Sequence, residues 1–131
     1  MDGWIGVVGA AVGAAAALIG QWISGKTTER VAFRSRQHAV LDDLSRKLAA
    51  VREQAGEAQQ SGGAEDAGLV AALRALVTIS PSIHDDVLRT QVNEFIDKAW
   101  GFRVKPVDWK LIQEPYVAVR ERLTMVYKDL G

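Results

Sequence analysis

Residues Trp4–Ile23 read WIGVVGAAVGAAAALIGQWI, a run of apolar and small residues that contains no charge. A helix of about 20 residues is about 30 Å long, which matches the hydrocarbon core of a bilayer. Trp4 and Trp22 stand near the two ends of the run, and tryptophan rings favour the headgroup level of a membrane. The run therefore predicts a transmembrane helix, with residues 1–25 as an N-terminal membrane anchor.

The charges on either side of this span predict its orientation. Basic residues outnumber acidic ones from residue 26 to residue 52, whereas Asp2 is the only charged side chain ahead of the span. Lys and Arg close to a span mark its cytoplasmic side. We therefore expect a single-pass protein of the inner (plasma) membrane, with its N-terminus outside and its C-terminal domain in the cytoplasm. The basic residues expected at the membrane interface are Lys26, Arg30 and Arg34.

A cleaved signal peptide is the alternative interpretation of the same run. Signal peptides begin with basic residues, have an apolar core of about 7–15 residues and end at small residues. Here Asp2 stands where a basic residue is expected, and the apolar run is longer. Ala14–Ala17 resemble a cleavage site but lie inside the run, so an uncleaved anchor is favoured.

Small residues recur along the predicted span at helical spacing. Those expected to pack against another helix in the membrane are Gly6, Gly9, Gly13, Ala17 and Gly20. Such residues let two helix backbones approach closely when lipid surrounds them. These residues favour homo-oligomer formation through the transmembrane helix, and the alternative is that glycine and alanine are simply common in weakly apolar spans.

Residues 26–131 have the pattern of a helical bundle. Apolar residues recur at steps of three or four in four stretches, and no stretch alternates as a strand does. Residues 56–66 are polar and glycine-rich, which predicts a Gly/Ser linker. The sequence thus predicts an all-α fold with one N-terminal transmembrane helix, followed by a cytoplasmic bundle of three to four helices.

Local signals predict where these helices begin and end. Ser80–Pro81–Ser82 should end the second bundle helix, and Ser82–Asp85 resembles a capping pattern for the next one. Asp108 can cap a short turn, and Pro115 is expected in the first turn of the last helix. The residues expected in the core are Leu44, Leu48, Leu73, Leu76, Val87, Phe95, Ile96, Leu123 and Val126.

Few residues of the sequence are candidates for catalysis or for binding a metal or a phosphate. The chain has no cysteine, and its two histidines, His38 and His84, lack the spacing of a zinc site. Residues 20–27 read GQWISGKT and match the pattern of a phosphate-binding loop, but that loop needs a preceding strand, which is not predicted. We therefore expect no catalytic residues, no metal, no cofactor and no enzymatic activity.

Two groups of residues suggest binding partners instead. The basic residues between 26 and 52 could bind nucleic acid, but a neighbouring membrane makes lipid headgroups the simpler partner, so nucleic acid is not expected. The aromatic residues Trp100, Phe102 and Trp109 cluster in sequence, and core packing is their default role. They are also the candidate contact patch for a protein partner.

The W-I-G opening of a Gly/Ala-rich span, followed by Arg30, Arg34, Arg36 and His38, resembles small single-pass membrane proteins of actinobacteria. The segment Arg120–Tyr127, which reads RERLTMVY, fits the same pattern. The resemblance implies an N-terminal span with a cytoplasmic helical bundle. Because this group is functionally uncharacterised, the resemblance implies no catalytic residues.

The sequence therefore favours a non-enzymatic, membrane-anchored interaction or scaffold module, whose protein partner it does not identify. The alternative is a holin-like or pore-forming oligomer built on the small residues of the span. A single predicted span without polar pore-lining residues argues against that alternative. An enzyme with unrecognised catalytic residues is the third hypothesis.

Overall fold

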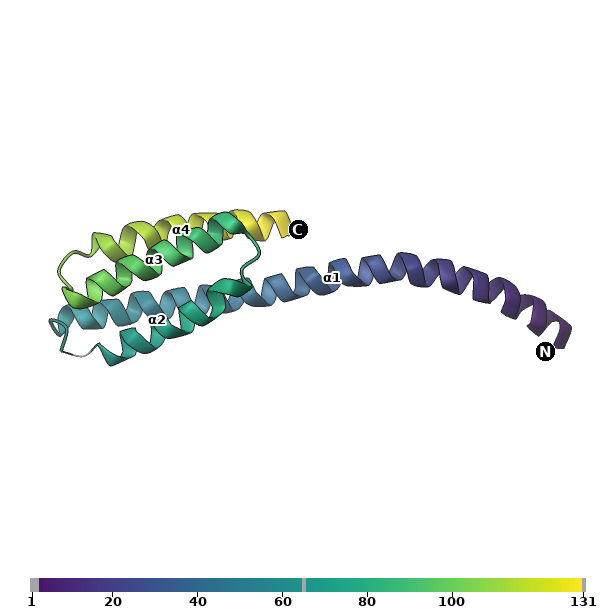
Figure 1. Ribbon diagram of the computed structural model, residues 1–131, viewed down its shortest axis with the longest axis horizontal. Helices are drawn as coiled ribbons and strands as arrows, with labels where there is room; N and C mark the ends of the chain where they lie inside the picture. Colours follow the sequence, from purple (N-terminus) through teal and green to yellow (C-terminus); the bar gives the residue numbers. More distant parts are fainter. Residues whose placement is uncertain (1–2, 65, 131) are drawn as a thin grey trace. The chain divides into compact units, whose positions relative to one another are not determined.

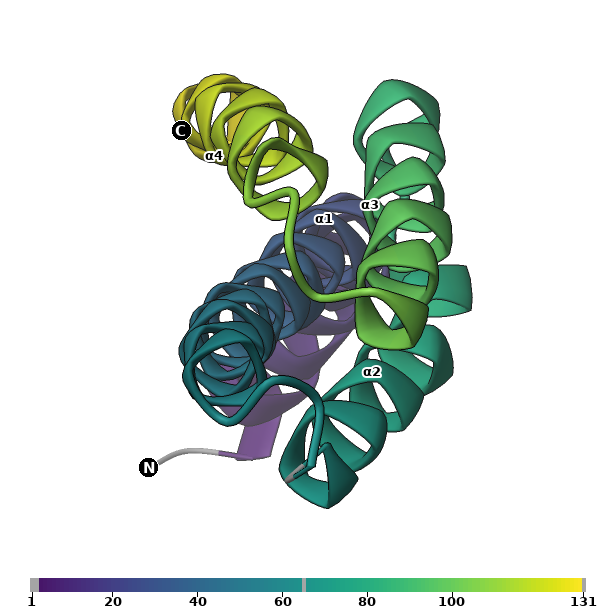
Figure 2. The same cartoon turned by 90° about the vertical axis from the view of Figure 1, so that its left-hand side faces the viewer.

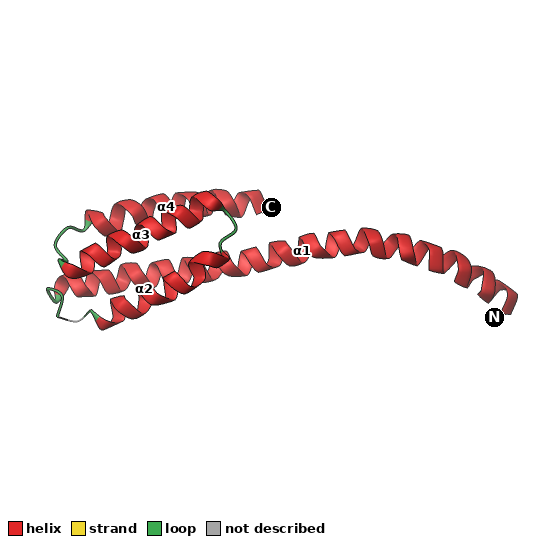
Figure 3. Ribbon diagram, in the orientation of Figure 1, coloured by secondary structure: helices red, strands yellow, loops and turns green. Residues whose placement is uncertain are grey.

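A computed structural model describes the chain at residues 3–64 and 66–130, with side chains from residue 29 onward. Its elements are α1 (Gly3–Gln60), α2 (Ala67–Ile79), the short 3-10 helix η1 (Ser80–Ser82), α3 (Asp86–Val104) and α4 (Lys110–Leu130) (Figure 1). All described elements are helical and none is a strand (Figure 3). The predicted all-α fold is thus confirmed for this part of the chain.

The chain divides into two units, Met1–Arg36 and Gln37–Gly131. Among the described residues, no helix has both the length and the apolar character needed to cross a membrane. The predicted span Trp4–Ile23, with Trp22, the small residues and the nearby Lys26, lies outside the described side chains. Arg30 and Arg34 lie within them and are exposed on α1.

In the second unit, the C-terminal part of α1 packs with α2, α3 and α4, and successive helices run in opposite directions (Figure 1). Viewed along the bundle, α2 and α4 lie on opposite sides, with α1 and α3 between them (Figure 2). All four helices contribute apolar side chains to one core. Its largest fully buried members are Phe95, Phe102, Leu41, Leu44, Leu48, Leu69, Leu73, Leu76, Ile83, Leu88, Ile112 and Val51.

Most of the predicted core residues are buried, but Val87 is not. Its side chain is 49 % exposed, and Val126 packs at the edge of the core. Ile83 and Val87 are four residues apart in the sequence, a spacing that predicts one helical stripe. Ile83 instead lies in extended backbone (φ −76°, ψ 118°) and enters the core from outside α3. The stripe of α3 therefore begins at Leu88 and continues through Val92 and Phe95.

The predicted linker is shorter than its composition suggests, because α1 continues through Gly56 to Gln60. Gly62 has a φ of 66°, and its N–H donates to Gln59 O at 3.2 Å. The N–H of Gly63 donates to Ala58 O at 2.8 Å. This pair of bonds is a Schellman motif, in which a glycine with positive φ satisfies the last carbonyls of a helix. The two glycines therefore act as a helix cap.

The N-cap of α3 is Asp85, and the predicted cap at Ser82 is wrong. Ser82 belongs to η1, whereas an oxygen of the Asp85 side chain accepts from Leu88 N at 2.7 Å. Arg122 of α4 donates to both carboxylate oxygens of Asp85, at 3.1 and 2.7 Å. Because the carboxylate accepts from two elements, it fixes the start of α3 against α4.

The predicted short turn and last helix are a single element. Asp108 accepts from Lys110 N at 3.1 Å, and α4 continues from Lys110 to Leu130 without interruption. Pro115 is buried inside α4 rather than in its first turn. A proline there removes one backbone hydrogen bond, a cost that burial of its ring in the core offsets in part.

Candidate functional site

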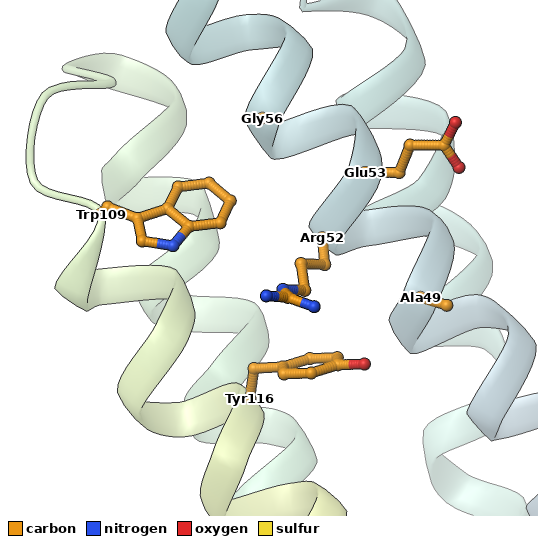
Figure 4. Close-up of a pocket in the computed structure, with 6 residues that line it drawn as sticks. All are labelled: Ala49, Arg52, Glu53, Gly56, Trp109 and Tyr116. Carbon is orange, nitrogen blue, oxygen red and sulfur yellow. The ribbon is translucent and has the colours of Figure 1, made fainter.

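An open groove between α1 and α4 is the candidate binding site of the bundle. Its volume is about 330 Å³. The residues that line it, hereafter the Trp109 groove, are Ala49, Arg52, Glu53, Gly56, Trp109 and Tyr116 (Figure 4). Ala49 and Gly56 of α1 have little or no side chain, so they form a shallow floor. The walls of the groove are the Arg52 side chain and the rings of Trp109 and Tyr116.

Arg52 is the charged centre of the groove. Its guanidinium carbon lies 5.0 Å from the centroid of the Tyr116 ring, which is cation–π range. The guanidinium points between Tyr116 and Trp109, whereas the Glu53 carboxylate points away (Figure 4). No described carboxylate is within salt-bridge distance of Arg52. The groove therefore presents an exposed cation without an acidic partner, beside aromatic surface.

Trp109 forms the end of the groove just ahead of α4. Its ring meets the buried Phe102 edge to face, with 5.8 Å between centroids and 75° between planes. A Cβ atom on Gly56 would lie 4.0 Å from the Trp109 ring, so ring and helix are in ordinary contact. The buried Phe102 thus supports the indole, and Trp109 itself is half-buried at the groove.

The predicted aromatic patch is not one surface. Phe102 is fully buried and cannot contact a partner itself. Trp100 lies two residues earlier on α3, about 200° around the helix from Phe102. It is half-buried, with the Arg103 guanidinium 5.5 Å from its ring centroid. Of the three predicted residues, only Trp109 lines the groove, and its companions Arg52 and Tyr116 belong to no local motif of the sequence.

The α1–α4 seam continues beyond the groove as a line of polar contacts. Arg120 Nη1 donates to Ser45 Oγ at 2.6 Å, and the Tyr127 hydroxyl donates to Asp42 Oδ1 at 2.5 Å. The His38 ring lies 5.9 Å from the Tyr127 ring. These contacts account for His38 by packing and hold α4 in register with α1.

Asp85 and Tyr127, at this end of the bundle, both have shifted pKa values. The hydrogen bond from Arg122 outweighs partial burial and lowers the pKa of Asp85. Burial, followed by the hydrogen bond to Asp42, raises the pKa of Tyr127 to about 12. At neutral pH each group is in the form that its folded environment favours, so Asp85 lowers stability only towards acidic pH and Tyr127 only towards alkaline pH.

Replacing Tyr127 with Phe should change how stability depends on alkaline pH. The folded pKa of Tyr127 lies above the unfolded value near 10, so its contribution is complete below pH 10 and is lost as pH rises towards 12. Urea midpoints of both proteins across this window measure the difference. Wild type should lose more stability than Tyr127→Phe, and parallel curves would contradict the assignment.

The described residues contain no cluster of three His, Asp or Glu side chains suited to a metal ion. His84 is exposed, and its backbone N–H donates to Gln37 Oε1 at 3.3 Å. Ser80 is buried and donates to Asn93 Oδ1 at 2.6 Å. Residues 20–27, which match the phosphate-loop pattern, fall within α1 and outside the described side chains.

No protein-family model matches the chain, and no curated protein or solved structure is significantly similar to it.

Proposed function

We propose that the protein is a non-enzymatic, membrane-anchored interaction module. Residues 1–25 anchor it in the inner membrane, and the helical bundle faces the cytoplasm and binds a protein partner. The sequence supports the anchor through the uncharged run Trp4–Ile23 and the basic residues that follow it. The observation that carries the binding role is the Trp109 groove with its unpaired Arg52.

The chemistry of the groove favours a partner segment with a carboxylate next to an apolar side chain. The carboxylate would pair with Arg52, whose guanidinium can donate two parallel hydrogen bonds. The apolar side chain would lie against Trp109 and Tyr116. Tryptophan, tyrosine and arginine are the residue types that most often dominate binding energy at protein interfaces. A rigid indole supported by Phe102 loses little freedom when it binds.

Photo-crosslinking in membranes tests this function. A photoreactive amino acid replaces Ala49 in the full-length protein, and a second protein carries it at the exposed Arg74 on α2. We expect a partner cross-linked at position 49 and not at position 74, through a segment that contains Asp or Glu. Trp109→Ala should weaken its affinity about 30-fold, the effect of losing an interface hot spot.

Charge-matched variants keep this test interpretable if Trp109→Ala loosens the bundle. Arg52→Gln removes the cation of the groove, whereas Arg46→Gln removes an exposed arginine of the same helix that pairs with Asp43 instead. We expect the cross-link to weaken with Arg52→Gln and to persist with Arg46→Gln. Equal cross-linking by both variants would refute the assignment of the groove.

A further inference from the structure

The helical segment 29–36, which precedes the bundle in the sequence, is exposed at every position. It carries Arg30, Arg34 and Arg36, and Glu29 is its one acidic residue. Val31 and Phe33 are also exposed, by 57 % and 36 %. The segment is therefore a cationic surface with apolar side chains among the charges.

The arginines of this segment differ from several arginines of the bundle, which pair with carboxylates. Arg103 Nε lies 2.8 Å from Asp66, Arg122 Nη2 lies 2.7 Å from Asp85, and Arg89 pairs with Asp86. No described carboxylate pairs with the arginines at 30, 34 and 36, and Arg36 Nε donates only to its own helix, at Ala32 O. Their positive charge is not neutralised within the described residues.

The spacing of the cations along the helix indicates which ligand they can bind. Arg30 and Arg34 are four residues apart on α1 and share one face, and Lys26 occupies the same register one turn earlier. Along a helix, Arg30 lies about 10 Å beyond Ile23 and Arg34 about 16 Å beyond it. The interfacial layer of a bilayer is about 5–8 Å thick on each side, and an arginine side chain extends this reach. Arg30, the described cation nearest to the predicted span, can thus contact lipid phosphates directly.

We propose that residues 29–36 bind the headgroups of anionic phospholipids in the cytoplasmic leaflet. The inference rests on the proposed membrane anchor and adds the class of lipid. Arginine forms bidentate hydrogen bonds with phosphate, and the negative surface of the leaflet attracts basic residues next to a span. The effect of each cation falls with its distance from Ile23, so Arg30 contributes more than Arg34, and Arg34 more than Arg36.

A spin label on the segment tests the proposal in the full chain. The sequence has no cysteine, so Ser35→Cys gives a single labelling site among the exposed residues. The protein is reconstituted in vesicles of phosphatidylcholine alone, or with about one third phosphatidylglycerol to supply anionic surface. A neutral, water-soluble relaxation agent then reports how accessible the label is. We expect accessibility to fall in the anionic vesicles and to recover at about 1 M salt.

Two triple variants of equal charge separate this surface from general electrostatics. The first replaces Arg30, Arg34 and Arg36 with Gln, and the second replaces the exposed bundle residues Arg74, Lys98 and Lys105 with Gln. The first variant should lower the ratio of docked to free label by at least about fivefold, the effect of losing one cation near the membrane surface. The bundle variant should behave as wild type.

Each outcome bears on one proposal. Protein that resists alkaline extraction but shows no lipid-dependent change at position 35 overturns the headgroup inference and leaves the anchor intact. Protein that docks on anionic vesicles and is then removed by alkali overturns the anchor and leaves the inference intact. Stronger protection of the label by added RNA than by anionic lipid, at equal phosphate concentration, would show that nucleic acid is the ligand.

Discussion

Replacing Phe95 with Ala should lower the free energy of unfolding by about 3–5 kcal/mol, the usual cost of truncating a fully buried aromatic ring. Phe95 has no exposed surface and lies on the core stripe of α3, where its ring centroid is 6.3 Å from that of Tyr116. Truncation removes transfer free energy and leaves a cavity that the four packed helices close only in part. Tyr116 also lines the Trp109 groove, so the same change should loosen one of its walls.

Urea unfolding of the full chain in detergent, followed by helical circular dichroism, measures this effect. Met125→Ala is the matched control, because Met125 is 54 % exposed on α4 and its truncation should change stability by less than about 0.5 kcal/mol. Similar, small effects for both variants would mean that Phe95 is not in the core of the folded protein.

Replacing Gly13 with Arg should remove most of the protein from the membrane fraction. An arginine at the centre of a span costs about 2.5–3.5 kcal/mol on insertion scales, which corresponds to roughly a hundredfold shift in the insertion equilibrium. Resistance of the full chain to alkaline extraction measures the fraction inserted.

Gly13→Leu is the control for this variant, since leucine adds bulk while favouring the bilayer. We expect Gly13→Leu to stay in the membrane fraction and Gly13→Arg to appear in the extract. Retention of both variants would show that residue 13 is not at the centre of a span.

The helical class and most of the core could be predicted from the sequence because burial repeats along each helix. Leu44 and Leu48, then Leu73 and Leu76, recur at the helical period and are buried as predicted. The errors lie where helices end. Ile83 is buried from extended backbone ahead of the cap at Asp85, so continuing the helical period back to it displaced the expected stripe and placed Val87 in the core.

Loop composition was misleading for a related reason. Gly62 and Gly63 are typical of a flexible linker, yet a glycine with positive φ is also what the last turn of a helix needs. A flexible linker and a helix cap can therefore have the same glycine-rich sequence. The hydrogen bond from Gly63 N to Ala58 O, which separates them, depends on where the helix stops.

The groove could be predicted only in part, because its residues come from distant parts of the chain. Trp109 is one of three aromatic residues that lie close together in the sequence, but Phe102 is buried against it. Arg52 and Tyr116 meet only when α1 and α4 pack together, and neither belongs to a local motif. An arginine outside the apolar stripe of its helix was the one available signal, and it does not distinguish a binding residue from an ordinary solvated one.

The location of the C-terminus tests the central claim, a cytoplasmic module on a membrane anchor, most directly. A reporter that is active only in the cytoplasm is fused after Gly131 of the full chain, and the N-terminus of the mature membrane-bound protein is sequenced. We expect an active reporter on a protein that still contains Trp4. A reporter that lies outside the cytoplasm and is inactive would contradict the orientation. A mature protein that begins near Ala17 would contradict the anchor.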